Sequence, residues 1–206
     1  MVTTGLLVRF EAVAGKEVEV TELLRSAMPM VRDEAATTAW FGIRFAGARF
    51  GIVDVFPDDD SRRAHLSGPV ADALMAQADQ LFTSPPDITH LEVLADKLPP
   101  GPAAPVPVTK ALLLTFKAKA SKNDEVEQFL RSAESIVAEE PGTIAWFAIG
   151  MGDGQYGIFD VFADNKGRLA HLSGKVPRAL ARNALSLVGS VPDMKMIDVL
   201  ADKLPG

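Results

Sequence analysis

The sequence predicts an α+β protein: two ferredoxin-like βαββαβ repeats that form one α/β barrel with antiparallel sheets inside a single chain. The first observation is a repeat. The stretch Asp54–Phe56 followed by Ala64–Gly68 returns 106 positions later as Asp160–Phe162 and Ala170–Gly174. The register between the copies holds without a gap, about half of the aligned positions are identical, and each copy has the size of a small domain. The second observation is the order of strand-like and helix-like stretches within each copy, which is that of the split βαβ fold.

The repeat divides the chain into three parts. We expect a first domain at residues 1–99, a linker at 100–109 and a second domain at 110–206. The linker is rich in proline and favours an extended polyproline conformation. It tethers the copies, so the second is always present at high effective concentration around the first. We therefore expect a pseudo-dimer within one chain, and the sequence leaves open a further homodimer.

The first half of each repeat predicts a strand and then a helix. From Leu6 to Val13 apolar residues alternate with other residues, which is typical of a strand. From Lys16 to Glu34 apolar residues recur every three or four positions, which indicates an amphipathic helix. Pro29 lies within this stretch and should kink the helix or divide it.

The second half predicts a hairpin, two helical segments and a last strand. The hairpin strands are expected at 37–46 and 49–56, and the last strand at 88–98. Between them, acidic residues at 58–60 suit a helix start, Ser67 is expected to cap a second segment, and Pro69 suits its first turn.

Several of these strands are apolar on both faces. Helices can cover only one face of a sheet, so the other face needs a partner sheet. We expect the second repeat to supply it, leaving a mostly apolar cavity in each half.

Composition narrows the classes of partner and compartment. The chain has 206 residues, a net charge of −6 and no cysteine. The excess of acidic residues lies in the first half, and basic stripes with interleaved aromatic residues are absent, so we expect no nucleic acid partner. Runs of about 18 apolar residues are also absent, and the N-terminus does not resemble a signal peptide. We expect a cytoplasmic protein without disulfides and without membrane contact.

The repeated motifs resemble a known family. Asp-Val-Phe ends the third strand at Phe56, His-Leu-Ser-Gly begins at His65, and Val-Leu-Ala lies at 93–95 on the fourth strand. Together with the element order, these resemble the antibiotic biosynthesis monooxygenase family of the dimeric α/β-barrel superfamily. The resemblance implies a barrel that relatives build from two chains. The activities it implies are cofactor-free oxygenation of aromatic compounds, quinol oxidation or haem degradation. The residue types that haem-degrading members use are absent from the matching positions, so we expect no cofactor.

The histidines shared by both repeats are the candidate catalytic residues. Imidazole titrates near neutral pH, so His65 and His171 could shuttle a proton or bind a phenol. The alternative is a helix histidine that bonds a backbone carbonyl at the break before Ser67. Separated histidines do not make a metal site, so we expect none.

Strand residues are the candidate substrate-binding residues. They are aromatic or charged and could line a pocket for a flat ligand: Trp40, Trp146, Phe56, Phe162, Arg44 and Tyr156. The alternative for the tryptophans is a place in the core or at an interface.

Charged residues among apolar neighbours need partners. For Asp54 the sequence suggests an ion pair with Arg44 or Arg9, although the second repeat has no arginine at either matching position for Asp160. The Asp-Lys pairs at 96–97 and 202–203 are expected to form a turn and a barrel-closing contact rather than a site.

The function predicted from sequence is cofactor-independent oxygenation of a small phenolic or quinol substrate, with His65 or His171 as the base. The expected partner is a small apolar or aromatic ligand. The alternatives are a non-catalytic small-molecule-binding or stress-response protein, and a purely structural barrel.

Overall fold

The structure is a computed structural model that describes residues 1–101 and 107–205. Half of the expected linker, residues 102–106, lies outside the described residues. Within the described residues the strands follow one another by hydrogen bonding in the order β1-β3-β2-β8-β5-β7-β6-β4 and form a closed barrel. The predicted fold class, an α+β protein with an antiparallel barrel, is confirmed. No helix in this part of the chain is long and apolar enough to span a membrane.

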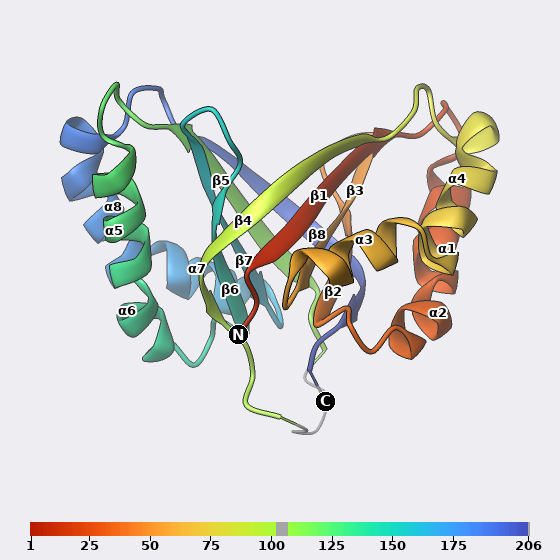
Figure 1. Ribbon diagram of the computed structural model, residues 1–206, viewed down its shortest axis with the longest axis horizontal. Coiled ribbons are helices and arrows are strands. Elements are labelled where there is room, and N and C mark those ends of the chain that lie inside the picture. The colour runs from red at the N-terminus through yellow and green to blue at the C-terminus, as the bar shows by residue number, and fades with distance from the viewer. Residues whose placement is uncertain (102–106, 206) are drawn as a thin grey trace. The chain divides into compact units, whose positions relative to one another are not determined.

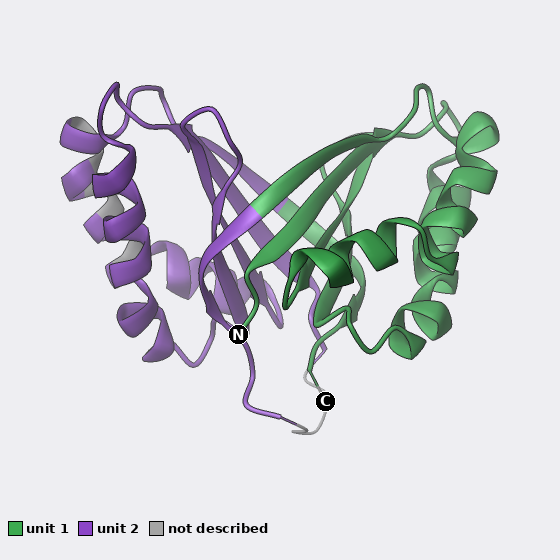
Figure 2. Ribbon diagram, viewed as in Figure 1, with its two compact units in different colours: residues 1–91, 197–206 green, residues 92–196 purple. Residues whose placement is uncertain are grey.

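The chain forms two compact units, drawn in separate colours in Figure 2. Unit 1 comprises Met1–Leu91 and Ile197–Gly206, and unit 2 comprises Glu92–Met196. The units differ from the repeats because the last strand of each repeat begins in one unit and ends in the other.

Two pairings carry this exchange of strands. In unit 2 the second half of β4 (Asp87–Lys97) pairs with β6 (Ala145–Gly150). In unit 1 the second half of β8 (Asp193–Lys203) pairs with β2 (Ala39–Arg44). In each unit, β2 or β6 therefore pairs with a strand segment from the other repeat.

Unit 1 places its helices on one face of its strands (Figure 1). Its further strands are β1 (Thr4–Glu11) and β3 (Arg49–Phe56), which pair antiparallel. Its helices are α1 (Glu17–Ser26), α2 (Met28–Asp33), α3 (Asp59–Leu66) and α4 (Pro69–Leu81). In β1, β2 and β3 the residues of even number face the helices and form one core with them, among them Leu6, Val8, Trp40, Ile52 and Phe56. This alternation puts Asp54 on the same helix-facing side.

Unit 2 repeats the arrangement. Its strands β5 (Lys110–Lys117), β6 and β7 (Gln155–Phe162) pair antiparallel with the same offsets. Its helices are α5 (Asn123–Ser132), α6 (Glu134–Ala138), α7 (Asn165–Leu172) and α8 (Lys175–Leu187).

The first helical stretch is divided, as predicted, but proline is not needed for the division. Pro29 is the second residue of α2, and its counterpart in α6 is Ser135. The chain nevertheless breaks at the same place in both copies. Ala27 has φ −70° and ψ −19°, and Ala133 has φ −71° and ψ −20°.

Ser67 does not cap the helix that follows it, so that prediction was wrong. Its hydroxyl donates to the carbonyl oxygens of Arg63 at 3.1 Å and Ala64 at 3.3 Å, which closes α3 instead. An N-cap residue needs extended backbone angles. Gly68 has them and Ser67 does not, so Gly68 precedes α4, and Pro69 opens it as predicted.

Candidate functional site

In each unit, three residues paired across neighbouring strands lie next to the candidate site. In unit 1 Asp54 is paired with Trp40, and Trp40 is paired with Lys203 of the exchanged strand. Residues directly opposite one another on antiparallel strands point to the same side of the sheet. The row therefore presents a carboxylate, an indole and an ammonium to the layer of helices. Unit 2 has the same row, with Lys97, Trp146 and Asp160.

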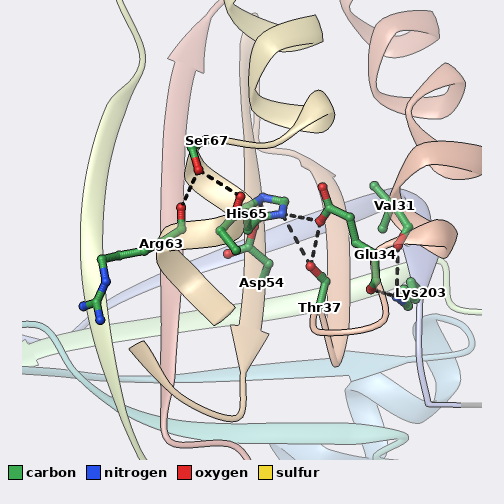
Figure 3. Close-up of polar contacts among 9 residues, drawn as sticks. Val31, Glu34, Thr37, Asp54, Arg63, His65, Ser67 and Lys203 are labelled. Atoms are coloured by element: carbon green, nitrogen blue, oxygen red, sulfur yellow. Dashed lines mark hydrogen bonds and ion pairs between the residues drawn. The ribbon is translucent and has the colours of Figure 1, made fainter. Parts of the chain in front are cut away.

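In unit 1 a histidine lies between two carboxylates (Figure 3). His65, in the last turn of α3, has its Nδ1 atom 2.6 Å from a carboxylate oxygen of Glu34. Its Nε2 atom lies 3.2 Å from an oxygen of Asp54. Thr37 donates its hydroxyl hydrogen to Glu34 at 2.8 Å and lies 3.4 Å from His65 Nδ1. Both ring nitrogens thus contact side-chain carboxylates.

Unit 2 repeats this cluster almost atom for atom. His171 Nδ1 lies 2.6 Å from Glu140, and His171 Nε2 lies 3.4 Å from Asp160. Thr143 donates to Glu140 at 3.0 Å. The histidine and the aspartate are buried, and the glutamate side chain is 19 % exposed. Glutamate is therefore the member of the cluster nearest to solvent.

These contacts replace two of the partners expected from sequence. The histidines bond carboxylates rather than a backbone carbonyl. Asp54 contacts His65 rather than an arginine, because Arg9 pairs with Asp87 at 2.6 Å and Arg44 lies over the ring of Phe50.

Burial and charge set the proton affinities of the clusters. Burial raises the pKa of Asp54, although its contact with His65 acts in the opposite direction. Burial alone would lower the pKa of His65, but the carboxylates of Asp54 and Glu34 outweigh it and raise that pKa to about 9. Burial also raises the pKa of Asp160 to about 7, against the attraction of His171. The clusters therefore hold or exchange protons near neutral pH.

A pocket of about 280 Å³ opens beside His171 in unit 2. Its lining includes Glu140, Thr143 and His171 of the cluster, and the remainder comes from α6, from residues 139–142, from α7 and from residues 174–175 at the start of α8. The described part of the chain holds no group of three or more histidine, aspartate or glutamate residues suited to a metal ion. In both clusters the histidine separates the two carboxylates, so they do not converge on one point.

Two glycines keep the pocket open. A Cβ atom on Gly142 would lie 3.6 Å from the Cα atom of Gly167, and one on Gly167 would lie 3.1 Å from the carbonyl oxygen of Gly142. The first repeat has Ala36 and Ser61 at these positions. The two clusters are therefore alike, but their surroundings differ.

The structure brings only some of the predicted pocket residues to the clusters. Phe56 and Phe162 pack against the histidines, with ring centroids 5.2 and 5.4 Å apart. Trp40 and Trp146 are fully buried in the two cores. Trp40 also borders a small apolar cavity of about 40 Å³ that residues of α1 and α4 line.

Arg44 and Tyr156 lie away from the histidines. Arg44 is paired with Phe50, four positions along β3 from Asp54, or about 13 Å at the rise of a strand. Its guanidinium lies 5.3 Å from the centre of the Phe50 ring. Tyr156 is the counterpart of Phe50 in unit 2, and its hydroxyl donates to Glu127 at 3.2 Å. Both residues therefore belong to the hairpin end of the sheet.

Sequence reasoning missed the glutamates and threonines of the clusters. Glu34 and Thr37 are preserved in the second repeat as Glu140 and Thr143. This shared Glu-x-x-Thr pattern was the available signal.

Comparisons with known proteins identify the fold. No family model matches the sequence, and no curated protein matches it. A putative monooxygenase from Fusobacterium nucleatum subsp. nucleatum has a TM-score of 0.87 and 15 % identity, over 100 % of this chain and 95 % of its own. An anthrone oxidase-like protein has a TM-score of 0.61 and 13 % identity, over 99 % of this chain and 94 % of its own.

A third similar structure is itself described as related to the antibiotic biosynthesis monooxygenases. It is an uncharacterised ferredoxin-fold protein related to antibiotic biosynthesis monooxygenases, from Listeria monocytogenes, with a TM-score of 0.54 and 7 % identity over 97 % of this chain and 95 % of its own. At these identities the comparisons show the fold. The likeness to the antibiotic biosynthesis monooxygenases that the motifs predict is confirmed at that level.

Proposed function

Because the chain has the ferredoxin-like barrel fold of proteins related to antibiotic biosynthesis monooxygenases, we propose that it is a cofactor-independent monooxygenase of small phenolic or quinol substrates. The observation that carries the proposal is the carboxylate–histidine–carboxylate cluster at the wall of the 280 Å³ pocket in unit 2. A pocket of this volume is close to the lower end of small-molecule sites and suits a ligand of one or two rings.

The contacts support one order of proton transfers. His171 lines the pocket, but both of its ring nitrogens already contact carboxylates, so neither nitrogen is free to take the proton of a substrate directly. Glu140 lines the pocket and is the most exposed member of the cluster. We therefore assign the first step, removal of the phenolic proton, to Glu140. His171 contacts Glu140 through Nδ1 and Asp160 through Nε2, so it passes the charge on by releasing its Nε2 proton to Asp160, whose pKa is about 7.

The reaction that follows needs only dioxygen. Loss of the proton makes the aromatic ring electron-rich enough to react with O₂ at the carbon para to the oxygen. One oxygen atom remains on that carbon as a carbonyl group. The other leaves as water with the phenolic hydrogen and the hydrogen displaced from the ring. A phenol with hydrogen at the para carbon plus O₂ thus gives quinone plus water, with atoms and electrons balanced. A quinol already carries a hydroxyl group at that carbon, so it gives up two electrons and two protons to O₂ and yields quinone plus hydrogen peroxide.

The names of two similar structures support this direction. One is named for monooxygenase chemistry and another for likeness to anthrone oxidase. Both resemble this chain over nearly its whole length. Their low identity leaves the substrate to experiment.

Oxygen uptake with a panel of quinols and naphthols tests the proposal. Wild-type protein should consume O₂, and Glu140→Gln and His171→Gln should each lower turnover by about 100-fold or more, the usual range for general acid–base groups. Glu34→Gln and His65→Gln are the matched substitutions in unit 1, and a loss of turnover confined to them would move the reaction to that cluster. Binding of the panel without oxygen uptake would instead favour the alternative, a non-catalytic binding protein.

A further inference from the structure

We propose that Lys97 is a positioning residue for the Glu140–His171–Asp160 cluster. The lysine lies on the last strand of the first repeat, and the cluster belongs to the second repeat. The proposal rests on the function proposed above for what Lys97 does to turnover. Its structural part stands on contacts within unit 2. Lys97 Nζ donates to the carbonyl oxygen of Val137 at 3.0 Å and to that of Glu140 at 2.6 Å.

These carbonyl groups lie at and just beyond the C-terminal end of helix α6, which ends at Ala138. Each already accepts one backbone hydrogen bond, Val137 from the N–H of Glu140 at 2.9 Å and Glu140 from the N–H of Thr143 at 3.3 Å, and Lys97 adds a second. A lysine near a helix C-terminus is also favoured by the helix dipole. The two hydrogen bonds hold the backbone from Val137 to Glu140. They therefore fix the residue whose carboxylate bonds His171 and lines the pocket.

Strand register places Lys97 and Asp160 together. Lys97 is paired with Trp146, and Trp146 is paired with Asp160 on its other side. One row of the sheet thus fixes both ends of the cluster. Asp160 contacts His171 directly, and Lys97 holds Glu140 through its backbone.

Unit 1 repeats the arrangement independently. Lys203 Nζ donates to the carbonyl oxygen of Val31 at 2.9 Å and to that of Glu34 at 2.6 Å (Figure 3). In each unit, then, the lysine comes from the repeat that does not supply the cluster. A repeat on its own would hold an incomplete site.

The ammonium also acts by its charge. Burial lowers the pKa of Lys97, and the negative charge of Glu140 opposes that shift, so the two side chains interact electrostatically. The other charged groups around Glu140 are His171, with Asp160 behind it, and the ion pair of Lys175 with Glu139 at the pocket. Removing Lys97 takes positive charge from the carboxylate that must be ionised to act as a base. The acid limb of the pH–rate profile should then move to higher pH.

The full chain offers a matched pair of variants. Lys97→Met and Lys203→Met each remove two equivalent hydrogen bonds, so thermal unfolding should register similar losses of stability. Only Lys97→Met should lower kcat, by about tenfold or more with KM little changed, because it displaces the base rather than the pocket. It should also move the acid limb upward, and Lys97→Arg should restore part of the rate.

Nuclear magnetic resonance of the imidazole rings tests the positioning without turnover. The chain has three histidines, so each ring signal can be followed through a pH titration. Lys97→Met should change the shift and pH response of His171 alone, and Lys203→Met those of His65 alone, with His90 unchanged in both.

The outcomes separate this proposal from the function it rests on. If Lys97→Met leaves the His171 signals unchanged, or alters all three histidines alike, Lys97 is a structural residue and the proposal is overturned. If the ring signals respond as expected but wild-type protein consumes no oxygen, the positioning stands and the oxygenase function fails.

Discussion

His65 and Asp54 meet at 3.2 Å on the helix-facing side of the sheet of unit 1, and the side chain of Asp54 is 1 % exposed. The other ring nitrogen of His65 is 2.6 Å from Glu34. A buried imidazole with a carboxylate on each side is more favourable when it is protonated, because its positive charge replaces the solvation that the carboxylates have lost. Protonation of His65 therefore stabilises the folded state.

The stability of the protein should fall as pH rises through the titration of this proton. The folded pKa of His65 is about 9 against an ordinary value of 6.5, so the folded state binds the proton more tightly than the unfolded chain. The resulting stabilisation is complete below pH 6.5 and is lost as pH rises through 9. At its fullest it amounts to about 3 kcal/mol. Urea unfolding at a series of pH values across this window measures it.

Two substitutions test this assignment. His65→Gln should remove most of the decline in unfolding free energy between pH 6.5 and 9. His90 is exposed, so His90→Gln should leave the decline unchanged. An equal decline in wild type and in His65→Gln would show that another group is responsible.

Tyr156 should remain protonated far above the ordinary range for tyrosine. Burial and the negative charge of Glu127 raise its pKa to about 12. It is the only tyrosine in the chain, so ultraviolet absorbance of the phenolate reports it alone. We expect little phenolate at pH 10, where a free tyrosine is half ionised, and a lower midpoint in Glu127→Gln. Half ionisation near pH 10 in wild type would contradict the buried hydrogen bond.

The fold could be predicted from the sequence because the repeat gives the two copies and the alternation of apolar residues gives the strands. The same alternation placed Asp54 among apolar neighbours and so marked it as needing a partner. It did not reveal Glu34, which at the end of a short helix looks like an ordinary surface acid. Glu34 and His65 are 31 positions apart, and only their packing shows that they meet.

The exchange of strands could not be predicted, for a specific reason. Residues 93–99 and 199–205 are identical, Val-Leu-Ala-Asp-Lys-Leu-Pro in both repeats. Nothing in these residues distinguishes pairing within a repeat from pairing with the other. That Arg44 and Tyr156 lie away from the histidines could not be read from the sequence either, because alternation gives the face of a strand but not the distance along it.

The helix break should tolerate proline in the second repeat. Ser135 is the second residue of α6, as Pro29 is of α2, and the backbone angles of the preceding break agree within a degree. Ser135→Pro should therefore stabilise the protein by about 0.4–1 kcal/mol, because proline restricts the unfolded chain at a site whose folded conformation it already fits. Pro29→Ser should cost a similar amount. Chemical denaturation of both variants checks this, and a clear loss of stability in Ser135→Pro would show that α6 needs the backbone N–H that proline removes.

Closing the pocket with the residues of the first repeat should abolish its use without unfolding the protein. Gly142→Ala and Gly167→Ser introduce the residue types that the first repeat has at Ala36 and Ser61. The new Cβ atom at 142 would lie 3.6 Å from the Cα atom of residue 167, and the new Cβ atom at 167 would lie 3.1 Å from the carbonyl oxygen of residue 142. A pocket that loses room for a methylene group discriminates by about 10- to 200-fold, so we expect kcat/KM for a quinol to fall at least tenfold.

Stability should not fall with it. Gly167 lies within α7, where replacing glycine favours the helix by about 0.5–1 kcal/mol, and its backbone N–H can keep its bond to Asp164, as Ser61 keeps the equivalent bond to Asp58. Ala36→Gly and Ser61→Gly in unit 1 are the matched controls and should leave kcat/KM unchanged. If filling the pocket left kcat/KM unchanged while the protein remained folded, the substrate would have to bind elsewhere.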